Sequence, residues 1–159
     1  MPGPLELDVT YAARRPWVPR RAQFAAWART ALSGAAPSRA TLPAARTSLS
    51  ILVVGAARSR SLNLRYRTRN RATNVLSFNG TGMGPDSRCF LGELVICAPV
   101  VAHEAKAQGK AAAAHWAHMT VHGVLHLLGF DHERRAEAKK MEAREIQILD
   151  RLGFSDPYV

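Results

Sequence analysis

Residues 122–132 read HGVLHLLGFDH, and the rest of the chain is organised around this stretch. His122 and His126 are one helical turn apart, so both imidazoles leave the same face of a helix. Glycine adopts the left-handed conformation at little cost, so Gly129 can end that helix and let the chain bring His132 towards the same point. Three imidazoles leave one position open on a tetrahedral ion, as in catalytic metal sites. The stretch therefore predicts a metal held by His122, His126 and His132.

The pattern of apolar residues around this stretch predicts an α+β fold. Residues 111–128 are apolar on most sides, which predicts a buried central helix. Strands are predicted at 5–11, 48–54, 73–78 and 91–97, and further helices at about 19–32, 58–66, 99–108 and 133–152. Glycine and proline predict loops at 33–46 and 79–87. We expect a small mixed four-stranded sheet packed with about five helices around the central helix, as one domain spanning all 159 residues.

Composition narrows the class of protein. An apolar content of 47% with 21% charged residues is typical of a soluble globular chain. The apolar runs are too short to span a membrane, and the N-terminus lacks the basic and apolar regions of a secretory signal. Two cysteines, Cys89 and Cys97, in a chain without a signal predict a cytoplasmic protein with reduced thiols.

The net charge of +10 lies entirely in the first half of the chain. Thirteen arginines and two acids through Pro85 give +11, and the remainder carries −1. One interpretation is that an arginine- and alanine-rich chain reflects the coding bias of its genome. The other is an electropositive face that binds a polyanion with salt-dependent affinity.

Residues 61–78, SLNLRYRTRNRATNVLSF, carry arginines at four alternate positions, 65, 67, 69 and 71. The stretch can be a solvated basic loop. Alternatively, it can be a phosphate clamp beside the metal, because a guanidinium makes paired hydrogen bonds to phosphate oxygens. Tyr66 and Phe78 could stack on a base, but the pattern favours a place in the core for both.

The remaining histidines and one acid could support the site. His118 lies one turn before His122, so it is either a core histidine or one that orients a ligand. Asp131 either accepts a hydrogen bond from an imidazole or forms a turn. His103 is expected on an exposed helix face, and His115 on the central helix outside the motif.

Taken together, these motifs resemble the bacterial YbeY family. The resemblance rests on residues 62–78, 91–97, 115–119 and 122–132 and on the end of the chain, LGFSDPY at 152–158. It implies a single-strand-specific, metal-dependent endoribonuclease that acts on RNA rather than DNA. The implied ligands are His122, His126 and His132, usually to one zinc ion, and Arg67 is the implied functional arginine.

The resemblance also implies a process and partners. The process is maturation of the 3′ end of 16S rRNA, together with ribosome quality control. The implied partners are proteins of the small ribosomal subunit and an assembly GTPase. The chain departs from the common family pattern at Asn70 and Ala72, at residues 79–80 (NG) after Phe78, and at Glu93.

Two functions of other classes remain open from the sequence. The histidine spacing is that of metzincin peptidases, but Gly123 stands where those enzymes carry a glutamate base. A phosphodiesterase has less need of that base, because zinc brings the pKa of its bound water to roughly 7. The other alternative is a ribosome-assembly factor whose metal mainly holds the fold. Imidazoles also accept nickel or another divalent ion, so the residues do not fix the metal.

Overall fold

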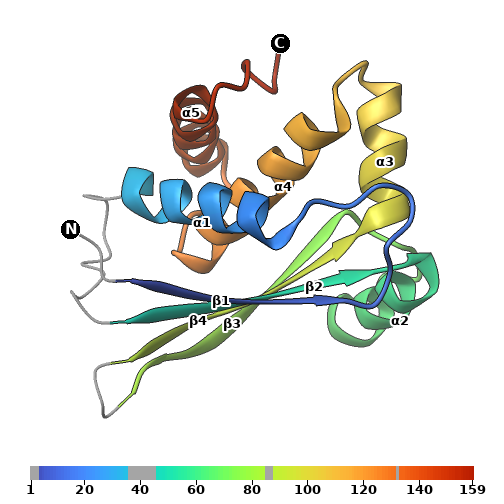
Figure 1. Cartoon of the computed structure of the whole chain (residues 1–159), viewed down its shortest axis with the longest axis horizontal. Helices are drawn as coiled ribbons and strands as arrows, with labels where there is room; N and C mark the ends of the chain where they lie inside the picture. The colour runs from blue at the N-terminus through green and yellow to red at the C-terminus, as the bar shows by residue number, and fades with distance from the viewer. Residues whose placement is uncertain (1–3, 36–45, 85–87, 132) are drawn as a thin grey trace.

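The computed structural model describes residues 4–35, 46–84, 88–131 and 133–159. These residues form four strands and five helices (Figure 1). In chain order they are β1 (Leu5–Tyr11), α1 (Arg21–Ala35), β2 (Thr47–Val54), α2 (Ala56–Arg67), β3 (Val75–Met83), β4 (Cys89–Cys97), α3 (Ala98–Ala107), α4 (Ala112–Leu127) and α5 (Arg135–Arg151). The predicted α+β class and the number of elements are confirmed.

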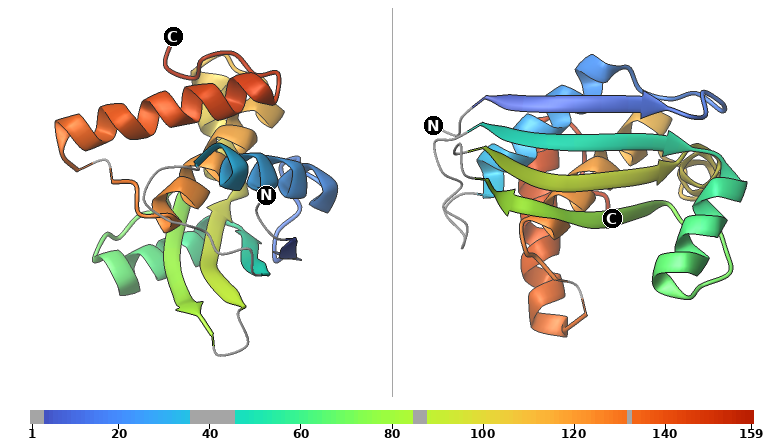
Figure 2. Two further views of the ribbon diagram at one scale, coloured as in Figure 1. Left: turned by 90° about the vertical axis from the view of Figure 1, so that its left-hand side faces the viewer. Right: turned by 90° about the horizontal axis from the view of Figure 1, so that it is seen from below.

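The sheet is mixed, as predicted, and its strands lie in the order β1-β2-β4-β3. β1, β2 and β4 run parallel, while β3 pairs with β4 in the antiparallel direction. Parallel neighbours need a crossover connection, which α1 supplies between β1 and β2. Within the described residues, β3 is therefore an edge strand, and it is the strand that lies beside the end of α4 (Figure 2).

Helices α1 and α4 pack on one face of the sheet, and α5 packs against these two helices (Figure 1). Phe24 of α1 and Trp116 of α4 are fully buried there, with ring centroids 5.9 Å apart in an edge-to-face contact. Burying a side chain of this size contributes about 1.5–3 kcal/mol. This packing fixes α4 against the sheet, and with it the direction in which the histidines leave the helix.

A smaller apolar cluster lies on the opposite face of the sheet, which α2 covers at one end (Figure 2, right). Its buried members are Val54, Leu76, Val95 and Cys97, and Leu62 of α2 packs against them. Both cysteines are free thiols, as expected, and Cys97 is buried.

Strand β3 is longer than the sequence predicts, because residues 79–83 extend it where a loop was expected. Their pairing with β4 shifts register between Asn79 and Gly82. A Cβ on Gly80 would lie 2.2 Å from the Phe90 carbonyl oxygen, so glycine permits a close approach of two strands here. The loop prediction was wrong because it read this glycine as a turn residue. The other predicted loop begins later than expected, because α1 includes residues 33–35, while residues 36–45 and 85–87 lie outside the described residues.

Among the helices of the described residues, none is both long and apolar enough to cross a lipid bilayer.

Candidate functional site

Helix α4 carries His122 and His126 on its last two turns and ends at Leu127. Gly129 follows with a φ of +97°, and the Phe130 amide donates to the Leu125 carbonyl at 3.1 Å. This is the glycine-dependent helix stop that the sequence predicts, and it reverses the chain after the second histidine. His132 lies outside the described residues, so its role as the third ligand stays a prediction.

The hydrogen bonds of His122 suit a metal ligand. Its Nδ1 lies 3.1 Å from Oε1 of Glu145, which is on α5. An ionised carboxylate only accepts hydrogen bonds, so Nδ1 carries the proton and Nε2 carries the lone pair that a metal binds. Carboxylates orient metal-binding imidazoles in this way in many metalloproteins.

The two predicted ligand histidines that the structure describes, His122 and His126, therefore fit the predicted metal ion. His122 and His126 supply two imidazoles to the same cavity. In the described part of the chain, no three histidine, cysteine or acidic side chains are grouped so that they could hold an ion together. The predicted site thus depends on His132 for its third ligand.

Glu145 is a functional candidate that the sequence reasoning missed. Its side chain is fully buried and accepts hydrogen bonds from His118 Nε2 at 2.9 Å, from His122, and from the Tyr158 hydroxyl. Burial alone would raise the pKa of this carboxyl, but the bonds from His118 and His122 outweigh burial and lower it to about 2. The available signal was a single acid on the core face of the last helix, between Met141 and Ile148.

His118 was expected either in the core or beside a ligand, and the structure places it in both settings. It is 8% exposed, and it shares the Glu145 carboxylate with His122. Its effect on the predicted metal ligand therefore passes through Glu145.

The cavity beside His122 and His126 has a volume of about 400 Å³. Three arginines line it together with the two imidazoles, and Glu133 is the only acid in its lining among the described residues. The full lining consists of Asn63, Arg67, Arg69, Arg71, Thr73, Asn74, Val75, Leu76, Ser77, His122, His126 and Glu133. Residues some fifty positions apart in the sequence are thus brought to one positively charged site.

Residues 68–74 between α2 and β3 carry Arg69 and Arg71 and form the arginine loop, which polar contacts from α2 hold in place. Ser59 and Asn63 are the buried residues of this helix, and their side chains bond to the main chain of the loop. The Ser59 hydroxyl exchanges two hydrogen bonds with the Thr73 main chain, and Asn63 Nδ2 donates to the Arg71 carbonyl at 2.8 Å. The prediction that Tyr66 faces the core was wrong, because the inner face of α2 is polar and Tyr66 is 50% exposed.

Arg67 lies at the end of α2 and reaches across to strand β3. Its Nη2 donates to the Ser77 carbonyl at 2.9 Å, and its guanidinium carbon lies 5.3 Å from the centre of the Phe78 ring. Phe78 packs edge-on against Tyr66 at 5.2 Å. These contacts direct the guanidinium towards the cavity, but the predicted role of Arg67 is not tested by them.

Gly123 occupies the face of α4 that packs on the sheet. A Cβ at this position would lie 2.7 Å from a Leu94 methyl group, and Leu94 is fully buried. A glutamate has no room here, so the position that carries a base in the peptidases is a packing position in this chain.

The other side chains considered from the sequence have structural contacts. Asp131 Oδ1 accepts a hydrogen bond from the Glu133 amide at 3.0 Å, as a turn residue does, and a bond between Asp131 and an imidazole stays a prediction. His115 lies 2.9 Å from Glu104, and His103 is exposed on α3, as expected. Asn70, at a position that departs from the common family pattern, accepts from Arg60 Nε at 2.7 Å.

Comparison of the sequence with known proteins identifies the family of this chain. A family model described as Endoribonuclease YbeY matches residues 14–153. Two curated relatives named Endoribonuclease YbeY, from Stenotrophomonas maltophilia strains R551-3 and K279a, are each 48% identical over 163 residues. Each alignment covers 98% of this chain and 96% of the relative. The chain belongs to the YbeY family of endoribonucleases.

Membership of the YbeY family confirms the resemblance seen in the histidine and arginine motifs, and it places the chain among endoribonucleases, enzymes that cleave RNA internally. The fold has a solved counterpart in the solution structure of TM1509 from Thermotoga maritima. That structure aligns with a TM-score of 0.54 at 16% identity over 96% of this chain and 98% of the other. At this identity the likeness supports the fold alone.

Proposed function

We propose that the chain is a metal-dependent endoribonuclease that cleaves single-stranded RNA at the cavity between α4 and the arginine loop. The observation that carries the proposal is the shared lining: His122 and His126 face the same cavity as Arg67, Arg69 and Arg71. Imidazoles suit a zinc ion, and guanidiniums suit phosphate oxygens. A phosphodiester is the substrate class that needs both.

The protein side of the mechanism follows from these contacts. His122, His126 and the predicted ligand His132 would hold the ion, and Glu145 keeps the His122 ring oriented through Nδ1. The chemistry that zinc supplies when bound is Lewis acidity, which brings the pKa of water to roughly 7 and polarises a phosphoryl oxygen. Arg67 donates to the phosphate and stabilises the charge that develops on it during cleavage.

The proposal includes a biological role that rests on the family resemblance. The substrate would be the 3′ end of the 16S rRNA precursor, in maturation and in ribosome quality control in the cytoplasm. The partners would be small-subunit proteins and an assembly GTPase. The basic first half of the chain and the basic cavity lining support an RNA substrate.

Two features argue against the peptidase alternative. Leu94 fills the space that a glutamate at Gly123 would need. A peptide substrate commonly pairs with an exposed sheet edge. On edge strand β3, Arg67 already bonds to the Ser77 carbonyl. Casein cleavage that a chelator abolishes would restore the peptidase alternative.

The test measures bound metal and RNA cleavage together in wild type, His126→Ala and Arg67→Ala, with a chelator control. We expect His126→Ala to lose metal and cleavage, and Arg67→Ala to keep metal while cleavage falls at least 100-fold. His103→Ala is the matched control, because His103 is exposed on α3 and outside the cavity.

A folded, metal-free His126→Ala variant that cuts single-stranded RNA like wild type would contradict the enzyme proposal. If that variant still binds and matures ribosomes without cutting RNA, the assembly-factor alternative is favoured. The end groups of the product identify the nucleophile, because a 2′,3′-cyclic phosphate indicates attack by the RNA 2′-hydroxyl and rules out direct attack by water.

A further inference from the structure

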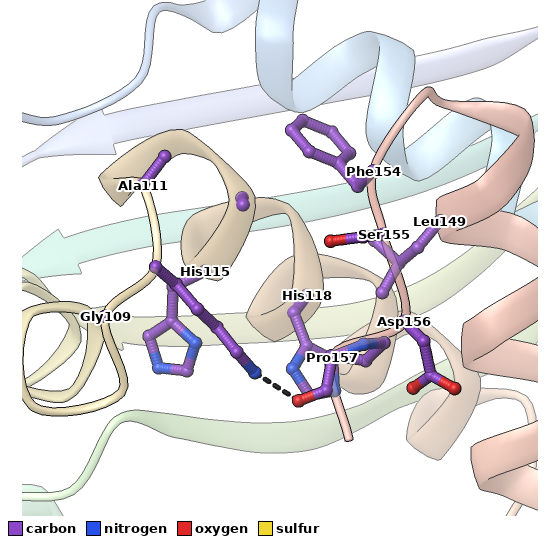
Figure 3. A pocket seen from close by; sticks show the side chains of 11 residues that line it. Gly109, Ala111, His115, His118, Leu149, Phe154, Ser155, Asp156 and Pro157 are labelled. Carbon is purple, nitrogen blue, oxygen red and sulfur yellow. Dashed lines mark hydrogen bonds between the residues drawn. The ribbon is translucent and has the colours of Figure 1, made fainter. Parts of the chain in front are cut away.

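The last residues of the chain fold back over His118 and Glu145, the most buried residues of the hydrogen-bonded group that includes His122. After α5, Gly153 adopts a φ of +86° and the segment that follows passes in front of His118 on α4 (Figure 3). Phe154 packs against Trp27 with ring centroids 6.3 Å apart, and the Lys110 ammonium donates to the Pro157 carbonyl (Figure 3). These contacts place Tyr158 beside Glu145.

Tyr158 is unusual because its ring is half exposed while its hydroxyl reaches a fully buried carboxylate. The hydroxyl lies 2.9 Å from each oxygen of Glu145. The ring stands edge-on to His118, with centroids 5.4 Å apart, and the hydroxyl is 3.3 Å from His118 Nε2. The half-exposed Tyr158 therefore links the C-terminal segment to the buried Glu145 carboxylate.

Among the described residues, Glu145 has three side-chain donors, and they are shared unequally between its two oxygens. His118 Nε2 is 2.9 Å from Oε1, and His122 Nδ1 is 3.1 Å from Oε1 but 3.5 Å from Oε2. Oε2 therefore has the Tyr158 hydroxyl as its short contact among the described residues. Without that hydroxyl, Oε2 loses its short contact, and the two imidazole bonds to Oε1 are left to oppose rotation of the carboxylate.

We propose that Tyr158 is a positioning residue that fixes Glu145 and, through it, the tautomer and direction of the His122 imidazole. The inference deepens the proposed function and rests on His122 being a metal ligand. A fixed carboxylate keeps the proton on Nδ1 and the lone pair on Nε2. The His122 ring therefore loses less conformational entropy when the ion binds. The C-terminal segment is then part of the metal site although it contributes no ligand.

The test uses Tyr158→Phe, which keeps the ring against His118 and removes only the hydroxyl. We expect its zinc dissociation constant, measured by competition with a chromophoric chelator, to rise about tenfold. Tyr11→Phe is the matched control, because it also removes a single hydroxyl bond, to the Pro19 carbonyl at 2.6 Å, on the first strand. It should bind zinc like wild type.

A second measurement needs neither metal nor activity. In metal-free protein with ¹⁵N-labelled histidine, at about pH 8, above the ordinary imidazole pKa of about 6.5, the ring nitrogens report the tautomer. The His122 signals are assigned by their loss in His122→Gln. We expect the Nδ1–H form alone in wild type and a mixture of tautomers in Tyr158→Phe.

A double-mutant cycle with Glu145→Gln tests the route. If Tyr158 acts through the carboxylate, Tyr158→Phe changes zinc affinity less than twofold in the Glu145→Gln background. A full tenfold loss there, or a Tyr158→Phe variant with wild-type affinity and tautomer, would overturn the proposal. Wild type that binds no zinc would contradict the proposed function instead, and the tautomer comparison would still decide the role of Tyr158.

Discussion

At the scale of single residues, the site depends on side chains whose role their neighbours decide. From the sequence, Gly123 is notable because it stands where a metzincin peptidase carries its glutamate base. The structure instead packs Gly123 against the buried Leu94. Glu145 reads as one acid of an amphipathic helix, yet it is fully buried and holds His118, His122 and Tyr158 together. In both cases a contact with another helix or strand decides the role of the residue.

The packing of Gly123 can be tested by adding one methyl group. We expect Gly123→Ala to lower the free energy of unfolding by about 1–3 kcal/mol, because the new Cβ overlaps Leu94 in a close-packed interior. Urea unfolding measures the loss. Leu94→Val removes the overlapping methyl groups, so in that background the same substitution should cost less. Equal losses in both backgrounds would show that the contact with Leu94 is not the cause.

At the scale of elements, helix α2 and the loop after it work as one unit. Leu62 of this helix packs against the sheet, and Ser59 and Asn63 bond to the main chain of the loop. The resulting bonds hold Arg69 and Arg71 at the edge of the cavity without a sheet or helix of their own. These bonds anchor an arginine-rich loop that has little apolar content.

Replacing Asn63 should loosen that unit. In Asn63→Asp the donor to the Arg71 carbonyl is lost and a buried carboxylate faces a carbonyl oxygen. We expect a loss of about 1–3 kcal/mol in unfolding free energy and weaker binding of single-stranded RNA, measured by fluorescence anisotropy. Asn70→Asp is the stability control, since it keeps an acceptor for Arg60 on an exposed side chain. RNA affinity unchanged in Asn63→Asp would refute the positioning role of this bond.

At the scale of the whole molecule, the fold brings an excess of arginine and a pair of imidazoles to one cavity. Strand β3 lies at the edge of the sheet beside α4. Helix α2 and the loop after it place the arginines at the same edge. The charge imbalance between the two halves of the sequence thus becomes a local field at the site. A field of this kind attracts a polyanion, and added salt weakens it.

Salt dependence measures how many of these charges meet phosphate. We expect the logarithm of RNA affinity to fall linearly with the logarithm of salt concentration. Arg69→Gln should reduce the slope by about 0.7, the value for one phosphate contact on a single strand. Arg29→Gln is the control, because Arg29 is exposed on α1 and outside the cavity lining. Equal slopes for wild type and Arg69→Gln would mean that Arg69 does not contact phosphate.

The sequence by itself determined the elements of the fold and the end of the central helix. The four strands and five helices follow from local periodicity, and Gly129 stops α4 because only glycine adopts its φ without strain. The spacing of His122 and His126 sets a common face by helix geometry alone, and the family followed from the same motifs. None of these features depends on a partner far away in the chain.

Only the tertiary structure decided which residues serve those histidines. Gly80 became part of a strand because Asn79 and Gly82 on either side of it pair with β4, against its local preference. Glu145 and Tyr158 joined the site because α5 and the last residues pack over α4. Tyr66 is exposed because the polar inner face of α2 bonds to the loop. Local patterns report which residues are apolar or charged, whereas the partner of a buried polar group is fixed by contacts between distant segments.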